Sequence, residues 1–225
     1  RNVAGGELSI SAGKGFAPYG TDDPMARPAV KYPTNHHLSQ VLERYTANVV
    51  YVRDGWSIEA GIFDGAEPTG PYDFGNIDNF PNSWSARLTK RFGAGSRWEA
   101  SASYADVVEV HHEEDVATSL VNAYIRHDGM TRFGRVYGLL EASRSEPEDG
   151  DGYFSVLGEA QLTRGRHQPY ARVELATRPE YARDAAAGDG FFRYDHDSHP
   201  IAATRWVITT VGYGLTATSL PWSVR

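Results

Sequence analysis

Six of the eight histidines lie in polar stretches of the chain, beside one another or beside acidic residues. These six are His36, His37, His111, His112, His196 and His199. Imidazole and carboxylate groups together bind transition metals. However, none of these histidines has the spacing of the HExxH zinc motif, and polar side chains are ordinary in exposed loops. We therefore expect solvated loop histidines, and metal ligation by these six is the weak alternative.

No set of residues in the sequence predicts catalysis. The chain has no cysteine, which removes disulfides and thiolate chemistry from consideration. No Gly-x-Ser-x-Gly nucleophile elbow is present, and Gly13-Lys14-Gly15 lacks the spacing of a phosphate-binding loop. The sequence therefore predicts a protein that is not an enzyme and that uses no cofactor.

A third group of residues is charged and lies at alternate positions within runs of apolar and polar residues. Its members are Glu59, Arg87, Arg97, Glu99, Arg135, Glu141, Glu159, Arg172 and Glu174. Successive side chains of a β-strand point to opposite faces, so these charges would share one face of a sheet while Ala, Val, Leu and Ile occupy the other. Charged rings select ions in pores. The pattern predicts a pore lining, and its mixture of signs leaves anion and cation selectivity open.

The elements that position these residues are β-strands. Residues 44–63 are the clearest case, because two alternating runs are joined by Asp54-Gly55, and an Asp-Gly pair supplies the positive φ angles of a type I′ hairpin turn. The same alternation predicts about ten strands in the chain. The other runs are residues 7–12, 83–92, 96–106, 116–126, 131–145, 153–163, 168–177 and 204–218.

The connections between these strands differ in length in a regular way. Short turns are predicted at Asp54-Gly55, Gly93-Ala94-Gly95, His127-Asp128-Gly129 and Arg164-Gly165-Arg166. The longest connections are residues 13–43, 64–82 and 178–203. Alternate connections of an up-and-down sheet lie at opposite ends, so one end should have tight turns and the other large loops. This asymmetry is typical of outer-membrane β-barrels.

A soluble β-barrel or β-sandwich would show the same alternation, because a period of two does not reveal which face contacts water. The loop asymmetry, the charges on the polar face and the small or medium apolar residues on the other face favour a membrane barrel. Aromatic residues near the strand ends would form its interfacial girdles. The girdle candidates are Tyr45, Trp56, Trp84, Trp98, Tyr104 and Tyr213.

Composition excludes some alternatives. The formal net charge of −7 argues against nucleic acid as a partner. No run of about 18 apolar residues predicts a transmembrane helix. The sequence stops at Arg225 within what reads as the start of another strand. We therefore expect residues 1–225 to be a single β-barrel domain or a fragment of a larger barrel.

Alternating strands, short glycine-containing turns and long acidic loops together resemble bacterial outer-membrane β-barrel proteins of the porin type. Three stretches resemble uncharacterised porin-like proteins more narrowly: Asn35-His36-His37 leading into residues 46–50, residues 59–68, and residues 84–88. The similarity covers most of the chain and is architectural, and no motif in it specifies a solute. Such barrels typically end on an aromatic residue, so Arg225 is a departure that supports truncation.

The resemblance implies an all-β, up-and-down antiparallel transmembrane β-barrel in the bacterial outer membrane. Such a protein would pass small hydrophilic solutes by diffusion, would contact outer-membrane lipid and lipopolysaccharide, and would be compatible with an oligomer. The alternative is a non-conducting envelope β-barrel that acts structurally or binds a partner through its long loops. In that case the Arg and Glu residues would be ion pairs within a closed interior.

Overall fold

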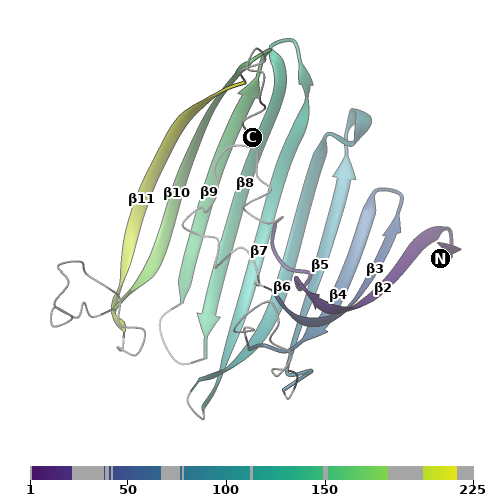
Figure 1. Cartoon of the computed structure of the whole chain (residues 1–225), viewed down its shortest axis with the longest axis vertical. Helices are drawn as coiled ribbons and strands as arrows, with labels where there is room; N and C mark the ends of the chain where they lie inside the picture. The colour runs from purple at the N-terminus through teal and green to yellow at the C-terminus, as the bar shows by residue number, and fades with distance from the viewer. Residues whose placement is uncertain are drawn as a thin grey trace, which may run out of the picture.

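The computed structural model describes residues 2–21, 38, 41, 43–66, 77, 79–111, 114–148, 152–181 and 200–216. Over these residues the chain is all-β, and eleven strands form a single sheet whose spatial order is the chain order. Every neighbouring pair of strands is antiparallel. The strands lie side by side from β2 near the N-terminus to β11 (Figure 1). The predicted all-β, up-and-down antiparallel fold is confirmed.

Most strands are long, with ten or more residues. Their bounds are β1 (Asn2–Val3), β2 (Gly6–Gly15), β3 (Arg44–Arg53), β4 (Trp56–Phe63), β5 (Ser83–Phe92), β6 (Trp98–His111), β7 (Glu114–Thr131), β8 (Gly134–Pro147), β9 (Tyr153–Thr163), β10 (His167–Tyr181) and β11 (Pro200–Leu215). A short 3₁₀ turn, η2 (Ala94–Ser96), joins β5 to β6.

Five tight turns lie at one end of the sheet, which we call the short-turn end. Asp54 and Gly55 have φ angles of 50° and 77°, as a type I′ turn requires, and the predicted hairpin is confirmed. Ala4 and Gly5 have φ angles of 49° and 78° and close a second turn of this kind between β1 and β2. The sequence interpretation overlooked this turn and the two-residue strand before it.

The turn predicted at His127-Asp128-Gly129 is wrong. Strand β7 continues through these residues, and the chain reverses at Arg132-Phe133, where Thr131 pairs with Gly134. Gly129 is not among the residues with positive φ, so the Asp-Gly pair does not form a type I′ turn here. Pairing of residues 118–131 of β7 with the whole of β8 overrides the local turn preference.

Several strands extend further toward the opposite end, which we call the long-loop end, than their apolar patterns suggest. Strands β6 and β7 pair as far as His111 and Glu114, so most of the polar stretch predicted as a loop between them is strand. Strand β2 likewise continues to Gly15 and pairs there with Arg44. Backbone hydrogen bonds between strands do not require apolar side chains, so the strands continue beyond the part of the sheet that the apolar residues cover.

The two faces of the sheet differ sharply in chemistry and in exposure. One face, the apolar face, carries aliphatic side chains whose exposed fractions run from 37% for Ile125 to 77% for Ile10. Its exposed aliphatic members are Ile10, Val49, Ile58, Ile62, Leu88, Val121, Ile125, Leu140, Val156, Val173, Leu175, Val207, Val211 and Leu215. The other face, the polar face, is largely buried. Register places the two sets on opposite sides, as in the pair Ile58–Leu88 beside the pair Glu59–Arg87.

Aromatic residues lie near both ends of the apolar face. Trp56, Phe92 and Trp98 lie near the short-turn end, and Trp84 and Tyr104 lie toward the long-loop end, with ring centroids 5.2 Å apart for the last two. Trp84 and Phe92 are eight residues apart on β5, which corresponds to about 26 Å along the strand. Of the girdle candidates, Tyr45 differs because its side chain is buried, at 8% exposure.

The apolar core of the described residues is small and lies on the polar side of the sheet. One cluster joins Tyr19, Val41 and Phe63 to residues of β6 and β7. A second cluster packs Tyr124, Leu139 and Leu157 together. The polar face therefore contains two small apolar clusters surrounded by polar side chains.

The sheet is open in the described ranges. Strand order runs from β1 to β11 with no pairing between these two edge strands, and β2 and β11 lie at opposite sides of the sheet in Figure 1. No helix in the described part of the chain is long and apolar enough to cross a lipid bilayer.

Candidate functional site on the polar face

Seven of the nine charged residues predicted to line a pore are buried or half-buried on the polar face. These are Glu59, Arg87, Glu99, Glu141, Glu159, Arg172 and Glu174. Five of the seven are buried, and Glu59 and Arg87 are half-buried. A charge leaves water at a high cost unless it is paired, so the partners of these residues determine what the face can do.

The first ion pair joins β4 to β5. Arg87 Nη2 lies 2.6 Å from Glu59 Oε2, and the two residues are direct cross-strand partners. Arg87 Nη1 also donates to the main-chain oxygen of Gly20, at 3.2 Å. The guanidinium therefore connects the sheet to the segment that follows β2.

A second cluster centres on Glu99 at the start of β6. Its carboxylate accepts from Arg91 Nε at 2.8 Å and from the Tyr124 hydroxyl at 2.7 Å, and Arg126 Nη2 lies 2.8 Å away. Together with Glu59 and Arg87 these residues line a cavity of about 240 Å³. The cavity wall thus has three guanidinium groups and two carboxylates, with fixed partners for both acids.

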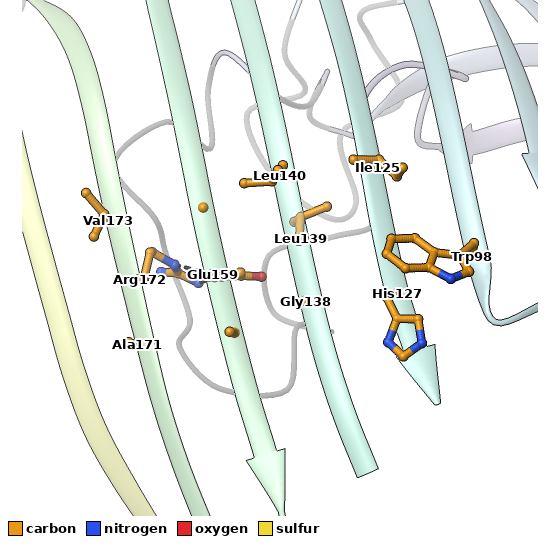
Figure 2. A pocket seen from close by; sticks show the side chains of 12 residues that line it. Trp98, Ile125, His127, Gly138, Leu139, Leu140, Glu159, Ala171, Arg172 and Val173 are labelled. Atoms are coloured by element: carbon orange, nitrogen blue, oxygen red, sulfur yellow. Dashed lines mark hydrogen bonds and ion pairs between the residues drawn. The ribbon is translucent and has the colours of Figure 1, made fainter. Parts of the chain in front are cut away.

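A third cluster lies on β8, β9 and β10. Arg172 donates from Nε to Glu159 Oε2 at 2.8 Å, and its Nη2 lies 2.6 Å from the same oxygen. The Tyr137 hydroxyl donates to Glu159 Oε1 at 3.0 Å, and Glu174 lies 3.9 Å from Arg172 Nη1. The side chains of Arg172 and Glu159 are only 2% and 3% exposed. Figure 2 shows this pair bridging two neighbouring strands.

The remaining two predicted residues, Arg97 and Arg135, lie at the short-turn end and do not join these clusters. Arg97 follows η2 and donates to the main-chain oxygen of Met130 at 3.1 Å. Arg135 forms a two-pronged pair with Asp128, at 2.7 Å and 2.6 Å. This exposed pair lowers the pKa of the Asp128 carboxyl, chiefly through the hydrogen bonds from Arg135, and raises the pKa of Arg135.

The segment of residues 16–21 lies against the polar face, although the sequence interpretation treated it only as part of a long loop. The Gly20 amide donates to Ser103 Oγ at 2.9 Å, and Tyr19 is buried at 2% exposure. The Tyr19 hydroxyl donates to the main-chain oxygen of Leu38 at 2.9 Å. The aromatic and small residues Phe16-Ala17-Pro18-Tyr19 were the signal that could have indicated packing, because exposed loops rarely carry such a run.

Sequence reasoning also missed partners on neighbouring strands. Arg91, Tyr124, Arg126 and Tyr137 each contact a predicted carboxylate. Each lies at a position with the parity of the polar face, so alternation alone places it correctly. Their contacts depend on register between strands, which a single sequence does not specify.

The loop histidines cannot be placed as a site. His36, His37, His112, His196 and His199 lie outside the described residues, and His111 is described only in its backbone. Among the side chains that the structure describes, no group of three His, Cys, Asp or Glu residues is arranged to hold a metal ion. Metal binding by the loops stays a prediction.

A comparison with models of protein families found no match, and a comparison with curated proteins found none either. The resemblance to porin-like proteins therefore stays a prediction. What the structure contributes is geometric: an antiparallel sheet with one exposed apolar face and one buried face that holds three groups of ion pairs.

Proposed function

We propose that this chain forms an outer-membrane β-barrel of the porin-like type, which lets small hydrophilic solutes diffuse across the bacterial outer membrane. The observation that supports this most directly is the inverted burial. Aliphatic side chains such as Leu140 and Val211 are 63% and 75% exposed, whereas Arg172 and Glu174 are each 2% exposed. A protein surrounded by water would gain by the opposite arrangement, because large contiguous apolar surfaces are rare on soluble monomers.

The dimensions of the apolar face suit a bilayer. The aromatic residues at its two ends are separated by about 26 Å along β5, and outer-membrane barrels carry an apolar band of about 25 Å between aromatic girdles. Hydrocarbon satisfies no backbone hydrogen bond, so every N–H and C=O in the band needs a partner strand. The proposal therefore requires the outer edges of β2 and β11 to be paired, with each other or with further strands of a larger barrel.

The polar face would line the lumen. Its ion pairs, hydroxyls and amides offer hydrogen bonds to hydrophilic solutes. Because the charges are of both signs, the face as a whole repels neither anionic nor cationic solutes. Ser85, Ser101, Ser103, Asn122 and Ser143 lie among the charged residues. Such a surface supports diffusion of small polar molecules without one strongly preferred solute.

A specific observation favours the second candidate, a non-conducting envelope barrel. Residues 16–21 cover part of the polar face, and Tyr19 packs with Phe63 in an apolar cluster there. Arg172 and Glu159 hardly contact water. If the interior is filled in this way over its whole width, the ion pairs brace a closed barrel and the loops at the long-loop end act as binding surfaces.

Reconstitution of the full-length protein into liposomes separates the candidates. We expect the protein to need detergent, to migrate differently on gels before and after boiling, and to make liposomes swell in solutions of small sugars. Liposomes that stay tight around a folded, inserted protein would contradict the channel and favour the non-conducting barrel. A folded protein that stays in solution without detergent would contradict both membrane candidates.

A further inference from the structure

The apolar face is not uniform, because a groove of about 430 Å³ crosses it from β6 to β10. Its floor is made of small residues at apolar-face positions of neighbouring strands, namely Gly138, Gly158, Ala160 and Ala171. Trp98 and Ile125 form the wall on one side, and Val173 forms the other wall (Figure 2). Almost all of its surface is carbon, so its occupant should be apolar.

Strand register explains why the groove exists. Ala160 lies between Gly138 of β8 and Ala171 of β10, and these three positions form one row across the sheet. On the next strand this row continues into His127 and then Trp98, whose rings are 4.7 Å apart. Three small residues beside two large rings leave a depression that no side chain of the sheet fills.

The turns above the groove are strongly basic. The three turns that join β5 to β6, β7 to β8 and β9 to β10 carry four arginines and no acidic residue, and Arg135 just after the second of these turns is paired with Asp128. The four arginines are Arg97, Arg132, Arg164 and Arg166. The turns at β1–β2 and β3–β4 differ, because acidic residues accompany the basic ones there. Arg53 is paired with Asp54, and Glu7 is the second residue of β2, directly after Gly6. Positive charge is therefore concentrated over the groove.

The distance between groove and turns is short. Gly138 is four residues from Gly134 at the β7–β8 turn, and Ala160 is four residues from Arg164, which is about 13 Å along each strand. An apolar chain in the groove would therefore continue directly to the level of the arginines. A ligand that matches both parts has an apolar tail and an anionic head.

We propose that the groove and the three turns above it form a binding site for an anionic phospholipid, with an acyl chain in the groove and the phosphate group at the arginines. This inference rests on the proposed membrane function. Basic residues near a bilayer surface attract anionic lipids, and guanidinium groups match phosphate in geometry. A second copy of the chain is a poorer occupant, because a two-fold interface at the groove would bring the same arginines together.

Two pairs of variants test the site in the full-length protein. Arg132→Gln with Arg164→Gln removes charge above the groove, and Arg53→Gln with Lys90→Gln removes the same charge elsewhere at the short-turn end. Ala160→Leu with Ala171→Leu fills the groove floor. Ala60→Leu with Ala86→Leu is its match, because these alanines are also cross-strand partners on the apolar face.

The measurement is binding of phosphatidylglycerol, and of phosphatidylcholine with the same acyl chains, to detergent-solubilised protein, read by native mass spectrometry. We expect the wild type to prefer phosphatidylglycerol. The Arg132/Arg164 variant should lose about tenfold in affinity for phosphatidylglycerol alone. The Ala160/Ala171 variant should bind both lipids more weakly, and both control variants should bind like the wild type.

Equal binding of the two lipids by the wild type would overturn the inference, and so would equal losses in a test variant and its control. The same preparations are assayed for insertion and for liposome swelling. Normal swelling without a preference for phosphatidylglycerol overturns the lipid site and leaves the proposed function intact. Failure to insert into vesicles contradicts the proposed function and removes the basis of the lipid site with it.

Discussion

The same strands form two faces with opposite properties, one apolar and exposed and the other polar and buried. On β8, Leu140 and Ala142 point to the apolar face, while Leu139, Glu141 and Ser143 point to the polar face. Leu140 is 63% exposed and Glu141 is 2% exposed. Successive residues of a strand point to opposite faces, so the alternation of apolar and polar residues along the sequence produces the difference between the two faces.

The comparison also shows which face holds specific interactions. Hydrogen bonds and ion pairs such as Arg172–Glu159 and Tyr124–Glu99 connect neighbouring strands on the polar face. The apolar face offers shape and hydrophobicity, with aromatic contacts near its ends. A surface that faces lipid accepts most aliphatic side chains but few charged ones, whereas removal of the partner of a buried charge is costly. We therefore expect added charges to be costly on the apolar face and loss of an ion-pair partner to be costly on the polar face.

The largest effect is expected from breaking the buried ion pair on the polar face. Arg172→Met leaves Glu159 buried without its guanidinium partner, and we expect a loss of about 3–5 kcal/mol in the free energy of unfolding. Urea unfolding of the reconstituted protein measures it. The matched control is Arg135→Met, which breaks the exposed pair with Asp128 and should cost about 0–1 kcal/mol. Equal losses would show that the polar face is no more buried than the turns.

A charge placed on the apolar face should cost nearly as much. Leu140→Arg lies within the apolar band, and an arginine that faces lipid near the middle of a bilayer costs about 2–4 kcal/mol. Met130→Arg is the control, because Met130 is equally exposed, at 63%, but lies at the short-turn end. We expect the first variant to insert into liposomes less efficiently than the second. If both insert equally well, Leu140 does not face lipid.

A smaller effect should separate two tyrosine hydroxyls, one from each face. Tyr124→Phe removes a buried hydrogen bond to the Glu99 carboxylate and should cost about 1.5–3 kcal/mol. Tyr104→Phe removes the bond between Tyr104 and Ser119 on the apolar face, at 3.0 Å, and should cost about 0.5–1.5 kcal/mol. Thermal unfolding of both variants tests the order. The reverse order would mean that the ion pairs with Arg91 and Arg126 are sufficient to stabilise the buried Glu99 carboxylate.

Sequence reasoning predicted the strands well because long alternation and a type I′ signal such as Asp54-Gly55 are local. Four strands, β3, β4, β5 and β9, begin and end where the sequence predicted. It was wrong at His127-Asp128-Gly129, where pairing with β8 decides the conformation. The same distinction holds for the site. Alternation put Glu159 and Arg172 on one face, but their contact, and the packing of residues 16–21 against Ser103, depend on tertiary structure.

Spin labels along β8 test the central claim most directly, and the absence of native cysteine makes single labelled positions straightforward. Cysteines are introduced one at a time at positions 138–145 of the reconstituted protein, and collision rates with oxygen and with a water-soluble nickel complex are measured. We predict a period of two, with oxygen favoured at 138, 140 and 142 and oxygen access reduced at 139, 141 and 143. Even-numbered positions that collide mainly with the nickel complex would show that water, not lipid, covers the apolar face.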